Sequence, residues 1–167
     1  LLFIIQMAHQ GTLVLPSPSW VSYSPQAQLV TKTVDWIDTR ASRWRLTGSA
    51  LDAYCQKRPT TPKLIVLNYP NNPTGLSFDA DQLAEIAEVC RTWGITVISD
   101  EIYGLVQHDG THRSIAEFYP EGTIVCNGLS KWCGAGGYRL GTFAFPPQLK
   151  WLLNAMLVIA SETYTSA

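Results

Sequence analysis

The chain has 167 residues, of which 46% are hydrophobic and 15% are charged, and this balance excludes an intrinsically disordered protein. Twelve basic residues against thirteen acidic ones give a net charge of −1, without the basic excess expected of a nucleic-acid-binding protein. The apolar run at residues 1–5 is too short to span a bilayer and lacks the flanks of a signal peptide, so we expect no membrane partner.

Five short apolar runs, rich in β-branched residues, predict β-strands. Near-continuous hydrophobicity over so few residues is typical of strands that are covered on both faces, as in a parallel sheet. The runs are residues 12–15, 63–67, 95–99, 123–126 and 141–145.

Two segments between and after these runs predict helices. In residues 79–93 the apolar side chains Leu83, Ile86, Ala87 and Cys90 recur at helical spacing, and Gly94 follows as a stop signal. Residues 147–160 repeat this kind of pattern at the end of the chain. The alternation of strands and helices predicts an α/β fold with a doubly wound, mostly parallel sheet.

The cysteines and histidines indicate neither a metal site nor a disulfide framework. No two cysteines have zinc-ligand spacing, so we expect free thiols in a reducing, cytoplasmic compartment. His108 and His112 have the spacing of a helical metal pair, but Asp109 and Gly110 between them favour a loop.

Polar and charged residues follow three of the predicted strands. Asn68 to Gly75 read NYPNNPTG, Asp100 to Tyr103 read DEIY, and Asn127 to Lys131 read NGLSK, with Arg139 eight residues beyond. Each segment alone has an ordinary explanation, as a turn, a helix cap or a solvated surface residue. Together they put an amide, a carboxylate, a phenol, a lysine and an arginine at the strand ends, where doubly wound sheets bind ligands.

This order of motifs resembles the class I and II aminotransferases, which are pyridoxal 5′-phosphate enzymes of fold type I. The resemblance covers residues 16–141 and rests on Asn72-Pro73-Thr74-Gly75, on Asp100 followed by Tyr103, and on Ser130-Lys131 followed by Gly137-Tyr138-Arg139-Leu140-Gly141. It implies the large domain of that fold, pyridoxal 5′-phosphate as cofactor, and amino transfer between an amino acid and a 2-oxo acid. It also implies a homodimer for the complete protein.

The resemblance assigns roles around the cofactor ring. Lys131 matches the lysine that forms the Schiff base and then moves the proton at the substrate carbon. Asp100 matches the carboxylate that pairs with the ring nitrogen, and Tyr103 and Asn72 match the two groups that hold the 3′ oxygen. Trp20 matches the aromatic side chain that stacks on the ring.

At the cofactor's phosphate the sequence follows the family only in part. Arg139 matches the guanidinium that clamps the phosphate through paired hydrogen bonds, and Ser130 matches a second phosphate contact. The family commonly has a serine three residues before the lysine, whereas this chain has Gly128. We therefore expect phosphate binding to be altered but retained. Tyr23 stands where family members place a partner for the buried carboxylate, and Ser17-Pro18 and Asn72-Pro73 are bonds that the family tends to hold cis.

Full-length members of the family carry segments that these residues do not match. These are an upstream glycine-rich phosphate-binding turn and a downstream small domain, whose arginine grips the substrate carboxylate. We therefore expect residues 1–167 to be a partial cofactor-binding large domain, without its N-terminal segment and C-terminal small domain. Such a chain would bind the cofactor weakly and transfer amino groups poorly or not at all.

Two other functions remain open from the sequence. The same residues would serve a C–S lyase, or another enzyme of this fold that breaks a different bond at Cα. Some transcription regulators carry a non-catalytic aminotransferase-like domain, although no basic helix-turn-helix is visible here.

Overall fold

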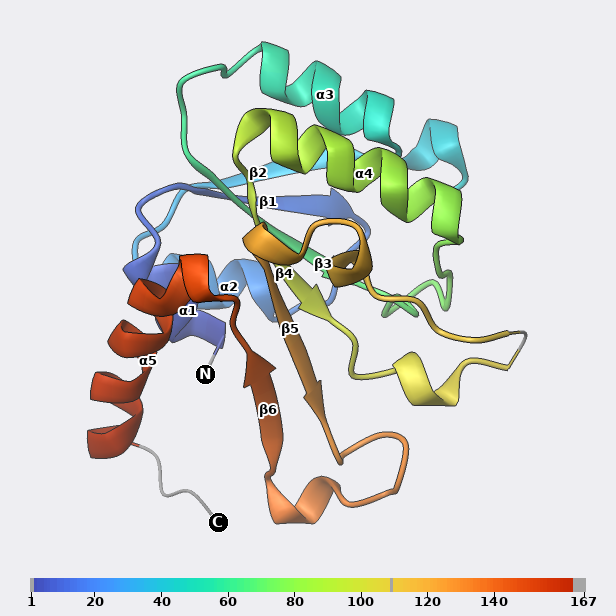
Figure 1. Ribbon diagram of the computed structural model, residues 1–167. Coiled ribbons are helices and arrows are strands. Elements are labelled where there is room, and N and C mark those ends of the chain that lie inside the picture. Colours follow the sequence, from blue (N-terminus) through green and yellow to red (C-terminus); the bar gives the residue numbers. More distant parts are fainter. Residues whose placement is uncertain (1, 109, 164–167) are drawn as a thin grey trace.

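A computed structural model describes residues 2–108 and 110–163 and has a six-stranded sheet at its centre (Figure 1). The strand order is β2-β1-β3-β4-β5-β6, in which the first five strands are parallel and β6 is antiparallel to β5. The strands are β1 (Thr12–Ser17), β2 (Val34–Asp38), β3 (Lys63–Asn68), β4 (Thr96–Asp100), β5 (Thr123–Gly128) and β6 (Gly141–Ala144).

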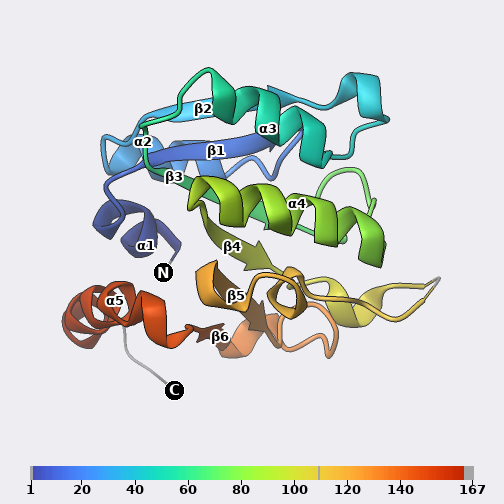
Figure 2. The same cartoon turned by 45° about the horizontal axis from the view of Figure 1, so that its top comes forward.

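Helices cover both faces of this sheet. They are α1 (Leu2–Ala8), α2 (Tyr23–Leu29), α3 (Gly48–Gln56), α4 (Ala80–Trp93) and α5 (Lys150–Thr163). Helices α3 and α4 lie side by side on one face, and α1, α2 and α5 lie on the other (Figures 1 and 2). The arrangement confirms the predicted doubly wound, mostly parallel α/β sheet.

The alternation of side chains along the strands divides the core into two layers. In β3, Ile65 and Leu67 face the layer under α3 and α4, whereas Leu64 and Val66 face the layer with α1, α2 and α5. Every residue of β3 is buried, which explains why its sequence is an unbroken apolar run after Lys63.

The predicted helix at residues 79–93 begins one residue later, because Asp79 is its N-cap. The Asp79 carboxylate accepts a hydrogen bond from the Gln82 amide, and the Gln82 side chain accepts one from the Asp79 amide. At the other end Gly94 has the left-handed conformation, and the Ile95 amide donates to the Cys90 carbonyl. Ile95 is thereby part of the helix stop, and the strand begins at Thr96.

The remaining differences lie in weakly patterned segments. The predicted helix at 147–160 is a 3₁₀ turn, Pro147–Leu149, followed by α5, which extends to Thr163. The edge strand β2 and the helices α1, α2 and α3 were not predicted. β2 is half exposed and carries Asp35 and Asp38, so it lacks the apolar run of an inner strand.

Other sequence-based expectations can be compared with the structure directly. All four cysteines are free, and only Cys133 is exposed. The bonds Ser17-Pro18 and Asn72-Pro73 are cis, as is Tyr69-Pro70. Within the described ranges, none of the helices combines the length and the apolar character needed to cross a membrane.

Candidate functional site

The carboxyl ends of β3, β4 and β5 bring three of the sequence motifs to one edge of the sheet. Asn68 pairs in register with Asp100, and Asp100 pairs with Cys126 on the far side. Because these strands are parallel, the chain segments that leave them all emerge at this edge. The candidate residues Asn72, Asp100 and Lys131 therefore start from neighbouring strand ends.

Asp100 is a partly buried carboxylate that is held by hydrogen bonds. The Tyr23 hydroxyl donates to its Oδ2 over 2.5 Å, and the Ile102 amide donates to its Oδ1 over 3.3 Å. Burial raises the pKa of Asp100 above its usual value, and the Tyr23 hydrogen bond opposes that rise. No lysine or arginine in the described part of the chain forms an ion pair with it.

Trp20 is linked to this carboxylate indirectly, because it packs on Tyr23. The two rings pack edge to face, with centroids 5.1 Å apart and an interplanar angle of 82°. Trp20 follows β1 and is half-buried against the core layer of α1, α2 and α5. The structure thus brings Trp20, Tyr23 and Asp100 together at one side of the candidate site.

Asn68, which sequence reasoning left without a role, joins two of the predicted residues. Its Nδ2 donates to the Asp100 carbonyl oxygen over 3.0 Å, and its Oδ1 accepts from the Asn72 amide over 2.8 Å. The side chain is almost fully buried, so both hydrogen bonds are shielded from water. Its position at the end of β3 was the available signal, but its partners follow only from the register of β3 and β4.

Asn72, Tyr103 and Lys131 meet although they come from three different strand ends. The Asn72 Nδ2 lies 3.4 Å from the Tyr103 hydroxyl, at the long end of the range for a hydrogen bond. The Lys131 Nζ lies over the Tyr103 ring, 5.5 Å from its centroid. An amide, a phenol and an amine therefore form one continuous group.

The loop between β5 and β6 carries Ser130, Lys131 and Arg139. Its ends are joined by a hydrogen bond from the Leu129 amide to the Leu140 carbonyl oxygen. Arg139 is exposed, and its Nη1 donates to the Gly136 carbonyl oxygen of its own turn over 2.8 Å. The structure thus places Arg139 on the same loop as Lys131, but its guanidinium forms no ion pair within residues 2–108 and 110–163.

The glycine at position 128 has a steric cause. A Cβ built on Gly128 would lie 2.9 Å from the Leu140 carbonyl oxygen and 3.2 Å from the Ile102 side chain. The close approach of β5 and β6 therefore leaves no room there for a serine without a backbone shift. A phosphate contact near the end of β5 would therefore come from backbone amides or from Ser130 in the loop that follows.

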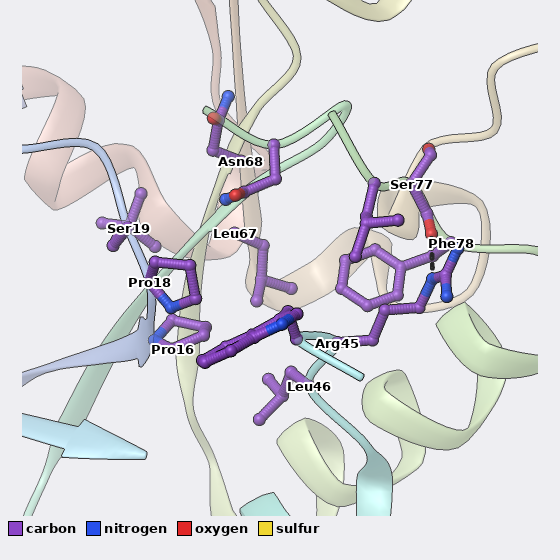
Figure 3. Close-up of a pocket in the computed structure, with 13 residues that line it drawn as sticks. Pro16, Pro18, Ser19, Arg45, Leu46, Leu67, Asn68, Ser77 and Phe78 are labelled. Carbon is purple, nitrogen blue, oxygen red and sulfur yellow. Dashed lines mark hydrogen bonds between the residues drawn. The ribbon is translucent and has the colours of Figure 1, made fainter. Parts of the chain in front are cut away.

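A hollow beside the site is lined by residues from the ends of β1 and β3 and from the segment before α3 (Figure 3). Pro16, Pro18 and Ser19 lie on one side of it, and Ser77 and Phe78 lie on the other. The Arg45 Nε donates to the Ser77 carbonyl oxygen over 3.0 Å and closes one end. Asp100 and Lys131 do not line this hollow, so it is separate from the group of charged candidate residues.

Comparison with known protein families shows to which family this chain belongs. A model of aminotransferase class I and II matches residues 1–167. The chain belongs to this family.

Curated relatives and solved structures agree with that membership. The chain is 33% identical over 97% of its length to an aspartate aminotransferase of Geobacillus stearothermophilus, of which it covers 41%. It is 35% identical over 81% of its length to a probable N-acetyl-LL-diaminopimelate aminotransferase of Bacillus subtilis, of which it covers 34%. The structure of an aspartate aminotransferase from Thermus thermophilus with maleate superposes with a TM-score of 0.88 at 28% identity, covering 99% of this chain and 43% of that one.

The chain spans about two fifths of the length of these relatives. Class I and II aminotransferases use pyridoxal 5′-phosphate, and the residues at the ring end of the candidate site fit that cofactor. Asp100 is a partly buried carboxylate with no cationic partner in the described ranges, which suits a protonated ring nitrogen. The residues expected at the cofactor's phosphate fit less well. Gly128 stands where the family commonly has a serine, and the Arg139 side chain bonds to the Gly136 carbonyl oxygen of its own turn.

Proposed function

We propose that this chain is the cofactor-binding part of a pyridoxal 5′-phosphate-dependent aminotransferase, which moves an amino group between an amino acid and a 2-oxo acid. The observation that carries the proposal is the grouping of Asp100, Asn72, Tyr103 and Lys131 at adjacent strand ends. When bound, pyridoxal 5′-phosphate supplies an electron sink for the charge that develops at the substrate Cα.

The residues proposed to contact the cofactor ring have different roles. The Asp100 carboxylate would pair with the ring nitrogen and favour its protonated form, and Tyr23 fixes that carboxylate in place. Asn72 and Tyr103 would hold the 3′ oxygen, and Trp20 would hold the face of the ring. In this arrangement the raised pKa of the buried Asp100 falls again once a positive charge lies beside it.

Lys131 is the proposed catalytic residue. Its amine would hold the cofactor covalently and, once freed by the substrate amine, would be the group that carries the proton to and from the substrate Cα. Ser130 and Arg139 are the proposed phosphate contacts, and the Arg139 Nε and Nη2 groups are the donors that its Nη1 bond to the Gly136 carbonyl oxygen leaves for that role.

Substrate and assembly are proposals that rest on the family. The relatives named above differ in their printed substrates, so we propose only the class, an amino acid and a 2-oxo acid. We further propose a cytoplasmic homodimer as the complete protein, in keeping with four free thiols and the absence of a membrane-spanning helix among the described residues.

The experiment that tests the proposal compares two ligands that share a ring. Pyridoxal 5′-phosphate and pyridoxal, which lacks the phosphate, are titrated into the chain while the absorbance of the bound ring is followed. The proposal predicts saturable binding of both, with the phosphate form tighter, and loss of the absorbance change in Lys131→Ala. Equal absorbance changes in Lys131→Ala and in the unaltered chain would refute the assignment.

A further inference from the structure

A buried polar cluster lies next to the candidate site and takes no part in the function proposed above. It consists of Tyr69, Ser99, Glu101, His112 and Ser114, and we call it the Glu101 cluster. Asp100 and Glu101 are consecutive, but they bond on opposite faces of the sheet. Asp100 meets Tyr23 in one core layer, whereas Glu101 meets Tyr69 in the layer under α3 and α4.

Glu101 is the centre of the cluster. Its Oε2 lies 2.8 Å from the His112 Nε2, and its Oε1 accepts from the Ser99 hydroxyl over 2.8 Å and from the Ser114 hydroxyl over 2.5 Å. Burial alone would raise the pKa of Glu101, but the hydrogen bonds from His112, Ser114 and Ser99 outweigh burial and hold that pKa below its usual value. Glu101 thus joins His112, Ser99 and Ser114 through one carboxylate.

Tyr69 connects the Glu101 cluster to Ile115. Its hydroxyl lies 2.7 Å from the Ser99 Oγ and accepts a hydrogen bond from the Ile115 amide over 2.8 Å. Its ring stacks on that of His112, with centroids 5.3 Å apart. The segment that follows β4 begins at Glu101. Near its other end, His112 and Ser114 contact the Glu101 carboxylate, and the Ile115 amide bonds to Tyr69.

The fastened segment carries Tyr103, which the proposed function places at the cofactor's 3′ oxygen. Beside Tyr103, Gly104 packs on His112, since a Cβ on Gly104 would lie 2.8 Å from the His112 ring. The Gly104 amide donates to the Glu101 carbonyl oxygen over 2.8 Å, and the Val106 amide donates to the Tyr103 carbonyl oxygen over 3.0 Å. The backbone of Tyr103 is therefore held between Glu101 and the surface formed by His112.

We propose that Glu101 and His112 are positioning residues that fix Tyr103 beside Asn72 and Lys131. The hydrogen bond between Glu101 and His112 holds the imidazole against Gly104, and this contact sets the direction in which Tyr103 leaves the sheet. The placement of Tyr103 requires no cofactor. Its consequence for the cofactor, a correctly placed donor at the 3′ oxygen, rests on the proposed function.

The test compares three variants of the segment. His112→Ala removes the imidazole, and His112→Gln keeps a donor near the position of Nε2. Arg113→Gln is the matched control, because Arg113 adjoins His112 but pairs with the exposed Glu117. Glu101→Gln, which keeps the volume and two acceptor contacts, replaces His112→Ala if that variant does not fold.

The first readout is amide hydrogen exchange of the cofactor-free chain at Gly104 and Val106. The proposal predicts exchange about tenfold faster at both amides in His112→Ala or Glu101→Gln, near-original rates in His112→Gln, and no change in Arg113→Gln. The Leu83 amide in α4, which donates to the Asp79 carbonyl oxygen, reports on the rest of the fold. Unchanged rates at Gly104 and Val106, or equal acceleration at Leu83, would overturn the proposal.

The second readout is the pH dependence of the absorbance of bound pyridoxal 5′-phosphate. A displaced Tyr103 no longer stabilises the 3′ oxygen, so the midpoint moves to higher pH in His112→Ala and returns in His112→Gln. A midpoint that does not move while Gly104 and Val106 exchange faster also overturns the proposal. If the unaltered chain binds no cofactor, the proposed function fails, and the exchange rates still decide whether His112 fixes Tyr103.

Discussion

The Tyr23 hydroxyl donates a hydrogen bond to the Asp100 carboxylate over 2.5 Å, and so links the first turn of α2 to the end of β4. Tyr23 is buried and Asp100 partly buried, and each shifts the pKa of the other. Burial, followed by the neighbouring Asp100 charge, raises the pKa of Tyr23 above its usual value, so this hydroxyl is a donor at neutral pH. The pair presents a fixed carboxylate at the edge of the sheet.

Replacing Tyr23 by phenylalanine leaves Asp100 without its strongest donor. We expect the free energy of unfolding of the cofactor-free chain at pH 7 to fall by about 1–3 kcal/mol, the cost of a lost hydrogen bond to a charged, buried group. The difference narrows in acid, because a protonated Asp100 needs this donor less. Urea unfolding at pH 7 and at pH 5 measures both effects, and an unchanged midpoint at pH 7 would rule out the coupling.

Replacing Asp100 by asparagine should stabilise the cofactor-free chain and weaken cofactor binding. The pKa of Asp100 is raised in the folded chain, so the proton binds more tightly to the folded form, and stability is lost as pH rises through that pKa. Asp100→Asn removes this loss, and we expect a gain of about 1–2 kcal/mol at pH 7 without cofactor. Pyridoxal 5′-phosphate binding weakens about tenfold or more, because the ring nitrogen loses its anion.

Asp38 provides the control for that substitution. It ends β2 as Asp100 ends β4, but it is exposed and bonds to Arg40. Asp38→Asn should leave cofactor affinity unchanged and should not stabilise the chain. Titrations with pyridoxal 5′-phosphate measure the affinities of Asp100→Asn and Asp38→Asn. Equal losses of affinity in the two variants would argue against a specific role for Asp100.

Asn68 is expected to affect the cofactor without touching it. Asn68→Ala breaks the bridge between the Asp100 carbonyl oxygen and the Asn72 amide, so it should weaken pyridoxal 5′-phosphate binding and cost about 1–3 kcal/mol of stability. Asn71→Ala is the comparison, since Asn71 bonds only within its own turn, to Thr74 and neighbouring backbone. Equal affinities in the two variants would contradict the bridging role.

His9 should make stability depend on pH in mild acid. Burial, followed by the nearby Lys32 ammonium, lowers the pKa of His9 from 6.5 to about 4, and its Nδ1 accepts a hydrogen bond from the Gly11 amide. The unfolded chain therefore binds the proton more tightly, and stability falls as pH drops from 6.5 toward 4, by at most about 3 kcal/mol. His9→Asn keeps an acceptor for Gly11 and should flatten that slope in urea unfolding series. An unaltered slope would exclude His9 as its cause.

The inner strands and α4 could be predicted from the sequence because local patterns determine them. Strand β3 is an apolar run of the length of a buried strand, and α4 has an apolar stripe, an N-cap at Asp79 and a stop at Gly94. Strand β2 could not be predicted in this way. It lies at the edge of the sheet, half exposed, and only its pairing with β1 makes it a strand.

In the candidate site, too, some residues could be placed from the sequence and others could not. Asp100 stands directly after one apolar run and Lys131 five residues after another, so their placement near strand ends could be predicted from the sequence. Asn68 and His112 gain their partners from the register of β3 with β4 and from the return of the chain to the sheet. The orientation of Arg139 likewise follows from its turn, in which it adopts a left-handed conformation and bonds to Gly136.

The assignment of Lys131 is the central claim, and the site of covalent attachment tests it most directly. Pyridoxal 5′-phosphate is added to the chain, the imine is reduced with borohydride, and the modified lysine is located by mass spectrometry of peptides. Lys57 and Lys150 are exposed and serve as internal references for nonspecific reaction. The account predicts that Lys131 carries most of the label. Labelling of Lys57 and Lys150 to the same extent as Lys131 would contradict it.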